Sequence, residues 1–504
     1  MMRITNSIIN GNSKYNINSN KISVDTLNTQ MSDQKKIHSP SEDPVVAIRS
    51  LRLRSSIAQI EQYQTNISDA LSWLDVTETA LLNMKDRITE VSKLSNQGAN
   101  DPLEVEDRRA ILDELKQIQK QIYDEGNADY AGRSIFTGFK TGESLTFTKT
   151  DLNTSYEITQ KFSPEDIESM TYISNSYELG NGVLEADPED LAKNRMPGAE
   201  EVNKINLGYN KIDEPPADQQ PMKIHYTDAD GQKFVMEARV KSVSEGDAAY
   251  VVAPGDEEVA YIIPETGELI LGSKATEMLR GAKEISFGYS KTGFQAGELR
   301  PEHYYDCTKV TNENGEEVNL EYTKQANKIE YTVSFNQVID INTEASEVFN
   351  SRMAHDINDM IDALQSLEDC DAKKADIQKM IEDPKYSSAE NQTKLKAMLR
   401  SVEKEKDLLD DKVQKLFERN IGRWQGYLDD VNLAITDCGS RVTRVELTES
   451  RMQSQESTFK KLKSVNDDRE LSEVIVDYTA AYTAYQASLQ ATGKAMKQTL
   501  LDYI

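Results

Sequence analysis

A heptad repeat of apolar residues restricts the fold of this chain more than any other feature of the sequence. Between Tyr63 and Ser95 the apolar positions alternate in steps of four and three residues, which is the spacing of a coiled-coil seam. The seam consists of Tyr63, Ile67, Ala70, Leu74, Thr77, Leu81, Met84, Ile88 and Val91. Because a narrow apolar stripe stabilises a helix mainly by packing against a partner, the sequence must supply a second helix elsewhere.

Boundary signals flank this helix. Before it, Ser41 or Asp43 can cap free backbone N–H groups, and Pro44 suits the first helical turn. A break is expected at residues 100–102. A second helix should follow and stop near Gly126. Its buried face is predicted to contain Ile111, Leu115, Ile118 and Ile122.

The periodicity changes to strand-like alternation between about residues 141 and 344. Asp230 and Gly231 separate two alternating runs and predict a hairpin turn. Residues 249–272 repeat the alternating pattern. This zone is therefore expected to be a mostly β domain that interrupts a helical protein.

Helical periodicity returns near Ala345 and continues almost to the end of the sequence. A loop is expected near Asp383 and Pro384, and a second break is possible near Gly439. One seam in this region is marked by Val413, Phe417, Trp424, Leu428, Val431 and Ile435. We therefore predict an α+β fold in which both chain ends form a long antiparallel helical bundle. The expected domains are a terminal coiled coil (1–42 plus 465–504), a helical bundle (43–140 plus 345–464) and a β-rich outer domain (141–344).

The two chain ends carry apolar stripes of unequal quality. The C-terminal stripe follows heptad steps through Leu471, Ile475, Tyr478, Tyr482, Tyr485, Leu489, Thr492, Met496 and Leu500. The N-terminal stripe consists of Ile4, Ile8, Tyr15 and Ile22 and lies among many asparagines, which are weak helix formers. We expect the N-terminal segment to order only when the C-terminal stripe and neighbouring copies bury its apolar residues. A frayed terminus on an intracellular helical bundle is the alternative.

The net charge of the chain limits which macromolecules it can bind. The 504 residues include 58 Lys and Arg against 86 Asp and Glu, a net charge of −28 that disfavours nucleic acid and anionic membranes. Protein partners are expected, although acidity alone can simply keep a surface soluble. No apolar run is long enough for a signal peptide or a membrane span, so the default location is cytosolic unless a dedicated machine exports the chain.

Few residues have the type and spacing of a catalytic, redox or metal-binding site. Cys307, Cys370 and Cys438 are widely spaced and form no CxxC pair, so a disulfide framework is not expected. His303 and Cys307 could form half of a metal site, but two further ligands are missing, and a structural pair is the simpler interpretation. No catalytic, metal-binding or cofactor-binding motif is found, and the abundant carboxylate pairs are expected by chance. The sequence therefore predicts a structural protein without a cofactor, and an enzyme site in the β zone is the weaker alternative.

Several motifs resemble those of the hook-associated protein 3 group of the flagellin family. They are MRIT at residues 2–5, PSEDPVVAIRSLRLRSSI at 40–57, SDALSWLDVTETALLNM at 68–84, NADYAGRSIFTGFKT at 127–141 and TLLDYI at 499–504. The residues that match the group's motifs are Asp43, Pro44, Trp73, Leu74, Gly132, Arg133, Phe136, Leu501 and Tyr503. The three cysteines and the insertion around residues 368–412 depart from the common pattern.

This resemblance implies a structural subunit at the junction between the flagellar hook and the filament, needed for filament assembly and motility. The implied partners are hook-associated protein 1, flagellin, further copies of the chain, the flagellar export apparatus and an export chaperone that binds the C-terminal helix. The implied location is the extracellular flagellum, reached by type III secretion without a cleaved signal peptide. A filament flagellin and a cytoplasmic coiled-coil scaffold remain as alternatives.

Overall fold

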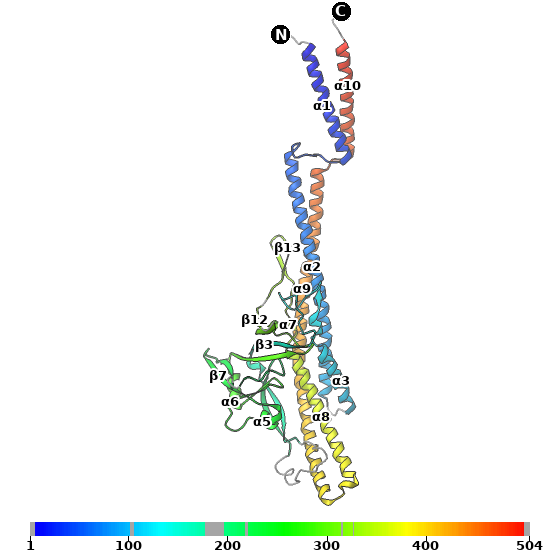
Figure 1. Cartoon of the computed structure of the whole chain (residues 1–504). Coiled ribbons are helices and arrows are strands. Elements are labelled where there is room, and N and C mark those ends of the chain that lie inside the picture. Colours follow the sequence, from blue (N-terminus) through cyan, green and yellow to red (C-terminus); the bar gives the residue numbers. More distant parts are fainter. Residues whose placement is uncertain are drawn as a thin grey trace, which may run out of the picture. The chain divides into compact units, whose positions relative to one another are not determined.

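The computed structural model describes residues 6–100, 105–176, 196–216, 220–313, 316–325 and 327–497. Its fold is α+β, as predicted, with long helices from both ends of the sequence and a mixed sheet encoded between them (Figure 1). The chain divides into two compact units. Unit 1 comprises residues 1–71, 331–339 and 443–504, and unit 2 comprises residues 72–330 and 340–442.

Unit 1 contains the two terminal helices. Helix α1 (Asn6–Asp33) lies beside helix α10 (Leu471–Lys497), as Figure 1 shows. The unit also holds the first part of α2 (Pro44–Gly98) and the last part of α9 (Ala389–Asp467), where Gln64 Nε2 donates to Glu456 Oε2 at 2.8 Å. The chain ends therefore pair with each other, as the sequence predicted.

A small hairpin packs on this part of the helices. It is formed by β13 (Glu330–Ser334) and β14 (Gln337–Asp340). Asn66 Nδ2 donates to the carbonyl of Thr332 at 2.8 Å, and Arg451 Nη2 donates to Gln337 Oε1 at 2.5 Å. These contacts fix the hairpin to both α2 and α9.

The helices of unit 2 bury the predicted seam. They are the rest of α2, α3 (Val105–Gln121), α7 (Ala345–Val348), α8 (Met353–Glu382) and the first part of α9. Every seam position of α2 from Leu74 to Val91 is buried, as are Ile67 and Ala70 in the part of α2 that belongs to unit 1. The predicted apolar residues of α3 and the following Ile122 are buried too. On α9, Leu428 and Ile435 are half-buried, whereas Tyr427 and Cys438 are buried beside them.

Two predicted features of the helical part needed revision. The loop at residues 383–388 is present, with a short 3-10 helix (Pro384–Tyr386), but α9 continues through Gly439 without a break. A glycine inside a helix costs about 1 kcal/mol relative to alanine, which packing of the neighbouring Cys438 and Val445 can offset. The actual interruption lies at residues 468–470, between α9 and α10.

The inserted part of unit 2 is built on a ten-stranded sheet. The strand order is β12-β11-β3-β10-β6-β7-β8-β9-β5-β4, and its pairs are antiparallel except for β7 with β8. The strands are β3 (Asp151–Phe162), β4 (Glu168–Ser174), β5 (Gly198–Asn206), β6 (Met222–Thr227), β7 (Lys233–Val240), β8 (Ala260–Ile263), β9 (Glu268–Leu271), β10 (Glu284–Phe294), β11 (Asp306–Glu313) and β12 (Glu316–Tyr322). Short helices α5 (Asp247–Tyr250) and α6 (Ser273–Arg280) and the two-residue strands β1 (Asp129–Tyr130) and β2 (Arg133–Ser134) complete it.

The predicted hairpin at Asp230 and Gly231 is confirmed. It joins β6 to β7, and Gly231 adopts the left-handed conformation at φ +86° that glycine tolerates best. The Asp228 side chain accepts hydrogen bonds from the N–H groups of Asp230 and Gln232, both at 2.9 Å. Local side-chain chemistry therefore fixes this turn.

Residues 249–272 differ from the predicted alternation. They begin with the end of α5 and a loop, and β8 is buried at every position. β8 lies between β7 and β9 in the sheet, and the burial of all four of its residues shows that both of its faces are covered. A strand covered on both faces has a continuously apolar sequence instead of an alternating one. In the described part of the chain, no helix combines the length and the apolar character needed to cross a membrane.

Candidate functional site

The terminal helices α1 and α10 meet through a face that sequence analysis assigned only in part. On α10 the residues that are buried or half-buried are Val474, Tyr478, Ala481, Tyr485, Ser488 and Thr492, again in steps of four and three. On α1 the corresponding face contains Ser13, Ile17, Asn20, Val24, Leu27 and Gln30. Tyr478, Tyr485 and Thr492 were predicted. The small and polar members of both faces were missed because they carry little hydrophobic signal. The apolar members Val474, Ile17, Val24 and Leu27 were missed because the predicted stripes followed other apolar residues of the same helices.

Most of the predicted stripe faces away from this contact. On α10, Leu471, Ile475, Tyr482 and Leu489 are 42%, 46%, 43% and 43% exposed. On α1, Ile8, Tyr15 and Ile22 are 50%, 75% and 59% exposed. The C-terminal stripe of the same chain does not by itself bury these three side chains, and their burial by that stripe together with neighbouring copies stays a prediction. The helical repeat places them on the other side of α1, so an apolar surface is left uncovered.

Some predicted residues cannot be placed. Ile4, Leu500, Leu501 and Tyr503 lie outside the described residues, as does the side chain of Met496. Their roles in assembly or in the family motif remain predictions.

The connections between the terminal helices and the rest of unit 1 form an elbow, defined here as residues 34–36 and 467–469. Lys35 and Asp468 form a β-bridge and an ion pair, and Lys36 N–H donates to the carbonyl of Asp467 at 2.8 Å. Arg469 N–H donates to the carbonyl of Gln34 at 2.9 Å. The elbow ties the end of α1 to the start of α10, which sets how the terminal helices leave α2 and α9.

The start of α2 is capped as the motif predicted. Asp43 Oδ1 accepts hydrogen bonds from the N–H groups of Val45 at 2.9 Å and Val46 at 3.1 Å, and Pro44 occupies the first helical position. Asp43, and not Ser41, is therefore the capping residue. The cap therefore fixes where α2 begins.

The other motif residues in the described ranges lie in the seam of α2 and in the segment that follows α3. Trp73 and Leu74 are buried in the seam, and the Trp73 ring meets Tyr130 edge-on with a centroid distance of 6.1 Å. Gly132 has φ +77° in the tight turn between β1 and β2, where a side chain would be strained. Phe136 is buried, and its ring lies 5.0 Å from that of Phe349, whereas Arg133 is exposed.

A cluster of buried charges joins the sheet to the helices of unit 2, and sequence analysis did not identify it. Glu168 at the start of β4 forms ion pairs with Arg352 and Arg423, and it is buried. Arg423 Nη1 also lies 2.6 Å from Asp356 Oδ1. The other carboxylate oxygen of Asp356, Oδ2, accepts a hydrogen bond from the Tyr427 hydroxyl at 2.7 Å. In a sequence with so many charges, these residues look like ordinary surface residues.

A second buried ion pair lies near this cluster. Lys204 of β5 is fully buried, with Nζ 2.6 Å from Glu268 Oε1 and 3.2 Å from Asp359 Oδ2. Burial alone would lower the pKa of Lys204, but the charges of Asp359 and Glu268 raise it above its ordinary value. Burial alone would raise the pKa of Asp359, but Lys204 holds it below its ordinary value. Both groups therefore stay charged, and they fix β5 to α8.

The residues considered for metal or redox chemistry, His303, Cys307, Cys370 and Cys438, are all buried. Burial lowers the pKa of His303 to about 4, and it raises the pKa of Cys307 and Cys370 to about 12 and that of Cys438 to about 11. Such thiols react poorly. Among the described residues, no group of three or more His, Cys, Asp or Glu is arranged to hold a metal ion.

The N-terminal helices are similar to one known family. Residues 4–141 match the bacterial flagellin N-terminal helical region. Flagellar hook-associated protein 3 of Salmonella typhimurium is 28% identical over 141 residues, which is 28% of this chain and 44% of that protein. A flagellin of Clostridium tyrobutyricum is 25% identical over 142 residues, covering 28% of this chain and 38% of that protein.

The chain thus spans less than half the length of these relatives. Among solved structures, the flagellar junction protein FlgL of Legionella pneumophila aligns with 84% of this chain and all of that chain, at 12% identity and a TM-score of 0.29. Through its N-terminal helical region, the chain is similar to the flagellin family, with flagellar hook-associated protein 3 and flagellins among its relatives.

Proposed function

We propose that this chain is a structural subunit of the bacterial flagellum that forms the junction between hook and filament. The observation that carries the proposal is the match of residues 4–141 to the flagellin N-terminal region together with the similarity to hook-associated protein 3. Its relatives are structural flagellar proteins. The protein would act by assembly and transform no ligand.

The uncovered apolar surface of the terminal helices supports an assembling protein. Ile475, Tyr482 and Leu489 lie at heptad spacing on α10, and each is still about half exposed in the single chain. Covering one such side chain completely would contribute on the order of 1 kcal/mol. A stripe of this kind suits neighbouring subunits, and repeated heterologous contacts build tubes or helical stacks.

The proposed partners follow from this place in the flagellum. They are hook-associated protein 1 on the hook side, flagellin on the filament side and further copies of the chain around the ring. Delivery would use the flagellar type III export apparatus and a chaperone for the C-terminal helix. The protein would then reside in the extracellular part of the flagellum.

Deletion of the gene tests the proposal. The mutant should keep its hooks, lose its filaments and motility, and release flagellin into the medium, and a plasmid copy should restore all three. Normal filaments in the mutant would contradict the proposal.

A filament flagellin is the second candidate, because relatives with 25% to 29% identity include flagellins and a flagellar filament core protein. The two functions differ in copy number. A filament subunit should be the main protein in sheared, purified flagella. A junction subunit should be a trace component of the same sample.

A further inference from the structure

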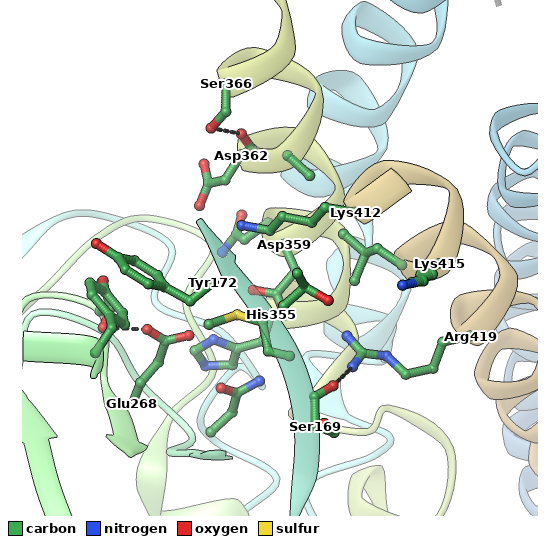
Figure 2. A pocket seen from close by; sticks show the side chains of 18 of the residues that line it. Ser169, Tyr172, Glu268, His355, Asp359, Asp362, Ser366, Lys412, Lys415 and Arg419 are labelled. Atoms are coloured by element: carbon green, nitrogen blue, oxygen red, sulfur yellow. Dashed lines mark hydrogen bonds between the residues drawn. The ribbon is translucent and has the colours of Figure 1, made fainter. Parts of the chain in front are cut away.

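One cavity of unit 2 lies between the sheet and helices α8 and α9, and its lining defines no ligand. Carboxylates and cations share its walls, among them Glu268, Asp359, Asp362, Lys412, Lys415 and Arg419 (Figure 2). Arg419 Nη1 already donates to the carbonyl of Ser169 at 2.6 Å. Because charges of both signs are present, no one class of ligand is favoured. The uncovered apolar residues of unit 1 define a partner more closely.

The terminal helices carry two uncovered apolar stripes of the same length and spacing. The α1 stripe consists of Ile8, Tyr15 and Ile22. The α10 stripe consists of Ile475, Tyr482 and Leu489. In each stripe a tyrosine lies one heptad from an aliphatic residue on either side. Laid antiparallel, the two stripes match residue for residue: Ile8 with Leu489, Tyr15 with Tyr482, and Ile22 with Ile475.

Within one chain the two stripes do not meet. The face of α1 toward α10 contains Ile17, Val24 and Leu27, and at the heptad repeat Tyr15 falls on the opposite side of α1. On α10, the stripe lies on the flank of the face that contains Val474. Each stripe is therefore available to a helix of another molecule.

The α10 stripe is continuous with the contact that α10 already makes with α1. Tyr478 belongs to that contact and is half-buried, and its ring stacks on the ring of Tyr482 with a centroid distance of 6.0 Å. The stack holds the Tyr482 side chain at the edge of the existing helix pair. A further helix that packs there would extend one interface instead of beginning a separate one.

The charges of the two helices favour the same pairing. Residues 6–24 of α1 include Lys14 and Lys21 and no acidic residue, whereas residues 471–493 of α10 include Glu473 and Asp477 and no basic residue. Asp477 pairs with Arg469 of the elbow, and Glu473 is exposed. Two copies with a net charge of −28 each repel over most of their surfaces. The opposite signs on α1 and α10 make these helices a favourable place for contact.

We propose that the α1 stripe of one copy packs antiparallel on the α10 stripe of the next copy. This proposal rests on the proposed assembly of several copies in the flagellum, and it names the surface by which each copy binds its neighbour. The two surfaces differ, so the contact is heterologous and repeats from copy to copy. The α1 stripe lies opposite the face toward α10, but the α10 stripe lies on a flank, so a row of such helices bends at each α10. A bent row winds around an axis, as a ring or tube requires.

Disulfide cross-linking between copies tests this contact. Tyr15→Cys and Tyr482→Cys are placed on two separately tagged copies, which are expressed together in the deletion strain, and the purified flagella are mildly oxidised. A disulfide needs Cβ atoms roughly 3.5–4.5 Å apart, so the product with both tags should be at least about tenfold more abundant than when Ala480→Cys replaces Tyr482→Cys. Ala480 is exposed on α10 but lies off the stripe. The native cysteines are buried and react poorly.

A charge pair tests the same contact without a disulfide. Tyr15→Lys and Tyr482→Asp should each reduce incorporation into flagella at least about tenfold, and the double variant should regain most of it, because opposite charges then meet between copies. The matched control combines Tyr15→Lys with Ile475→Asp, one heptad away, and should stay deficient. Circular dichroism of each purified variant should match that of the wild type.

A two-tag product that is no more abundant at Tyr482 than at Ala480 would overturn the proposal. Cross-linking of Tyr15→Cys to a different flagellar protein instead of to a second copy would overturn it as well. The junction function can fail separately: if the chain proves to be a filament subunit, the same cross-link is measured between copies in filaments. If the junction function holds and neither the cross-link nor the regained incorporation is seen, only this contact is refuted.

Discussion

At the scale of single residues, buried charges fix the sheet to the helices, and the sequence could not reveal them. Glu168, Lys204 and Asp356 are all buried, yet each is one of many charged residues in an acidic chain. Charged residues are rarely buried unless paired, and pairing depends on which strands and helices meet. By contrast, the cap at Asp43 and Pro44 and the turn at Gly231 could be predicted, because caps and turns depend on neighbours in sequence.

Removing the buried lysine should weaken unit 2. Lys204→Met leaves Glu268 and Asp359 without their partner, and we expect a loss of about 3 to 5 kcal/mol in the free energy of unfolding. Both tryptophans, Trp73 and Trp424, belong to unit 2, so denaturant unfolding followed by tryptophan fluorescence reports on it.

Lys274→Met provides the matched control. Lys274 is 53% exposed in its contacts with Glu257 and Glu258, so solvent screens these ion pairs and this change should cost much less stability than Lys204→Met. A similar loss in both variants would contradict the structural role given to Lys204.

The same ion pair predicts a pH dependence. The pKa of Asp359 is lowered in the fold, so its stabilising contribution is present above the unfolded value of about 4 and is lost as pH falls through the folded value. The pKa of Lys204 is raised in the fold, so the stabilising contribution of its charge is present below its unfolded pKa and is lost as pH rises through its folded pKa. The stability difference between wild type and Lys204→Met should therefore be flat from about pH 5 to pH 9 and shrink below about pH 4. An equal difference at pH 3 and pH 7 would count against this assignment.

At the scale of elements, periodicity located the helices well and their interfaces less well. The seam of α2 is buried as predicted because its apolar residues are also the residues that pack. On α10 the apolar stripe and the face toward α1 differ, since small and polar residues such as Ala481 and Ser488 form part of the contact. Apolar periodicity alone identifies the most hydrophobic stripe, and here much of that stripe lies outside the intramolecular contact.

Charge placed on the uncovered stripe should block assembly without unfolding the protein. Ile475→Asp or Tyr482→Asp puts a carboxylate on the exposed apolar surface of α10, so incorporation into flagella should fall at least about tenfold while unit 2 stays folded. Incorporation is measured by immunoblotting of purified flagella from a complemented deletion strain.

Ala480→Asp is the matched control, because Ala480 is also exposed on α10 but lies off the stripe. It should incorporate normally. Normal incorporation of Ile475→Asp would show that the stripe is not an assembly surface.

At the scale of the whole molecule, the order helix, β insertion, helix predicted the α+β fold and the pairing of the chain ends. It could not predict the ten-strand order, because pairing such as β3 with β10 and β11 depends on contacts between strands far apart in sequence. It also could not predict the elbow, where one β-bridge joins Lys35 to Asp468. The domain boundaries given above for the sequence stay predictions.

Stability should differ along the molecule. The contact between α1 and α10 contains serine and asparagine and leaves apolar residues exposed, whereas α2 buries a continuous apolar seam over residues 72–98. In dilute monomer, amide hydrogens of α1 and α10 should exchange at least about 100-fold faster than those of this part of α2. If the amide hydrogens of α1 and α10 were as well protected from exchange as those of residues 72–98, the ends would already be folded before assembly.

The central claim is that the chain sits at the junction of hook and filament, and immunogold labelling of whole flagella tests it most directly. With antibodies against the purified protein, gold should collect at the boundary between hook and filament and be absent from the deletion strain. Gold distributed along the filament would contradict the claim and identify a filament subunit.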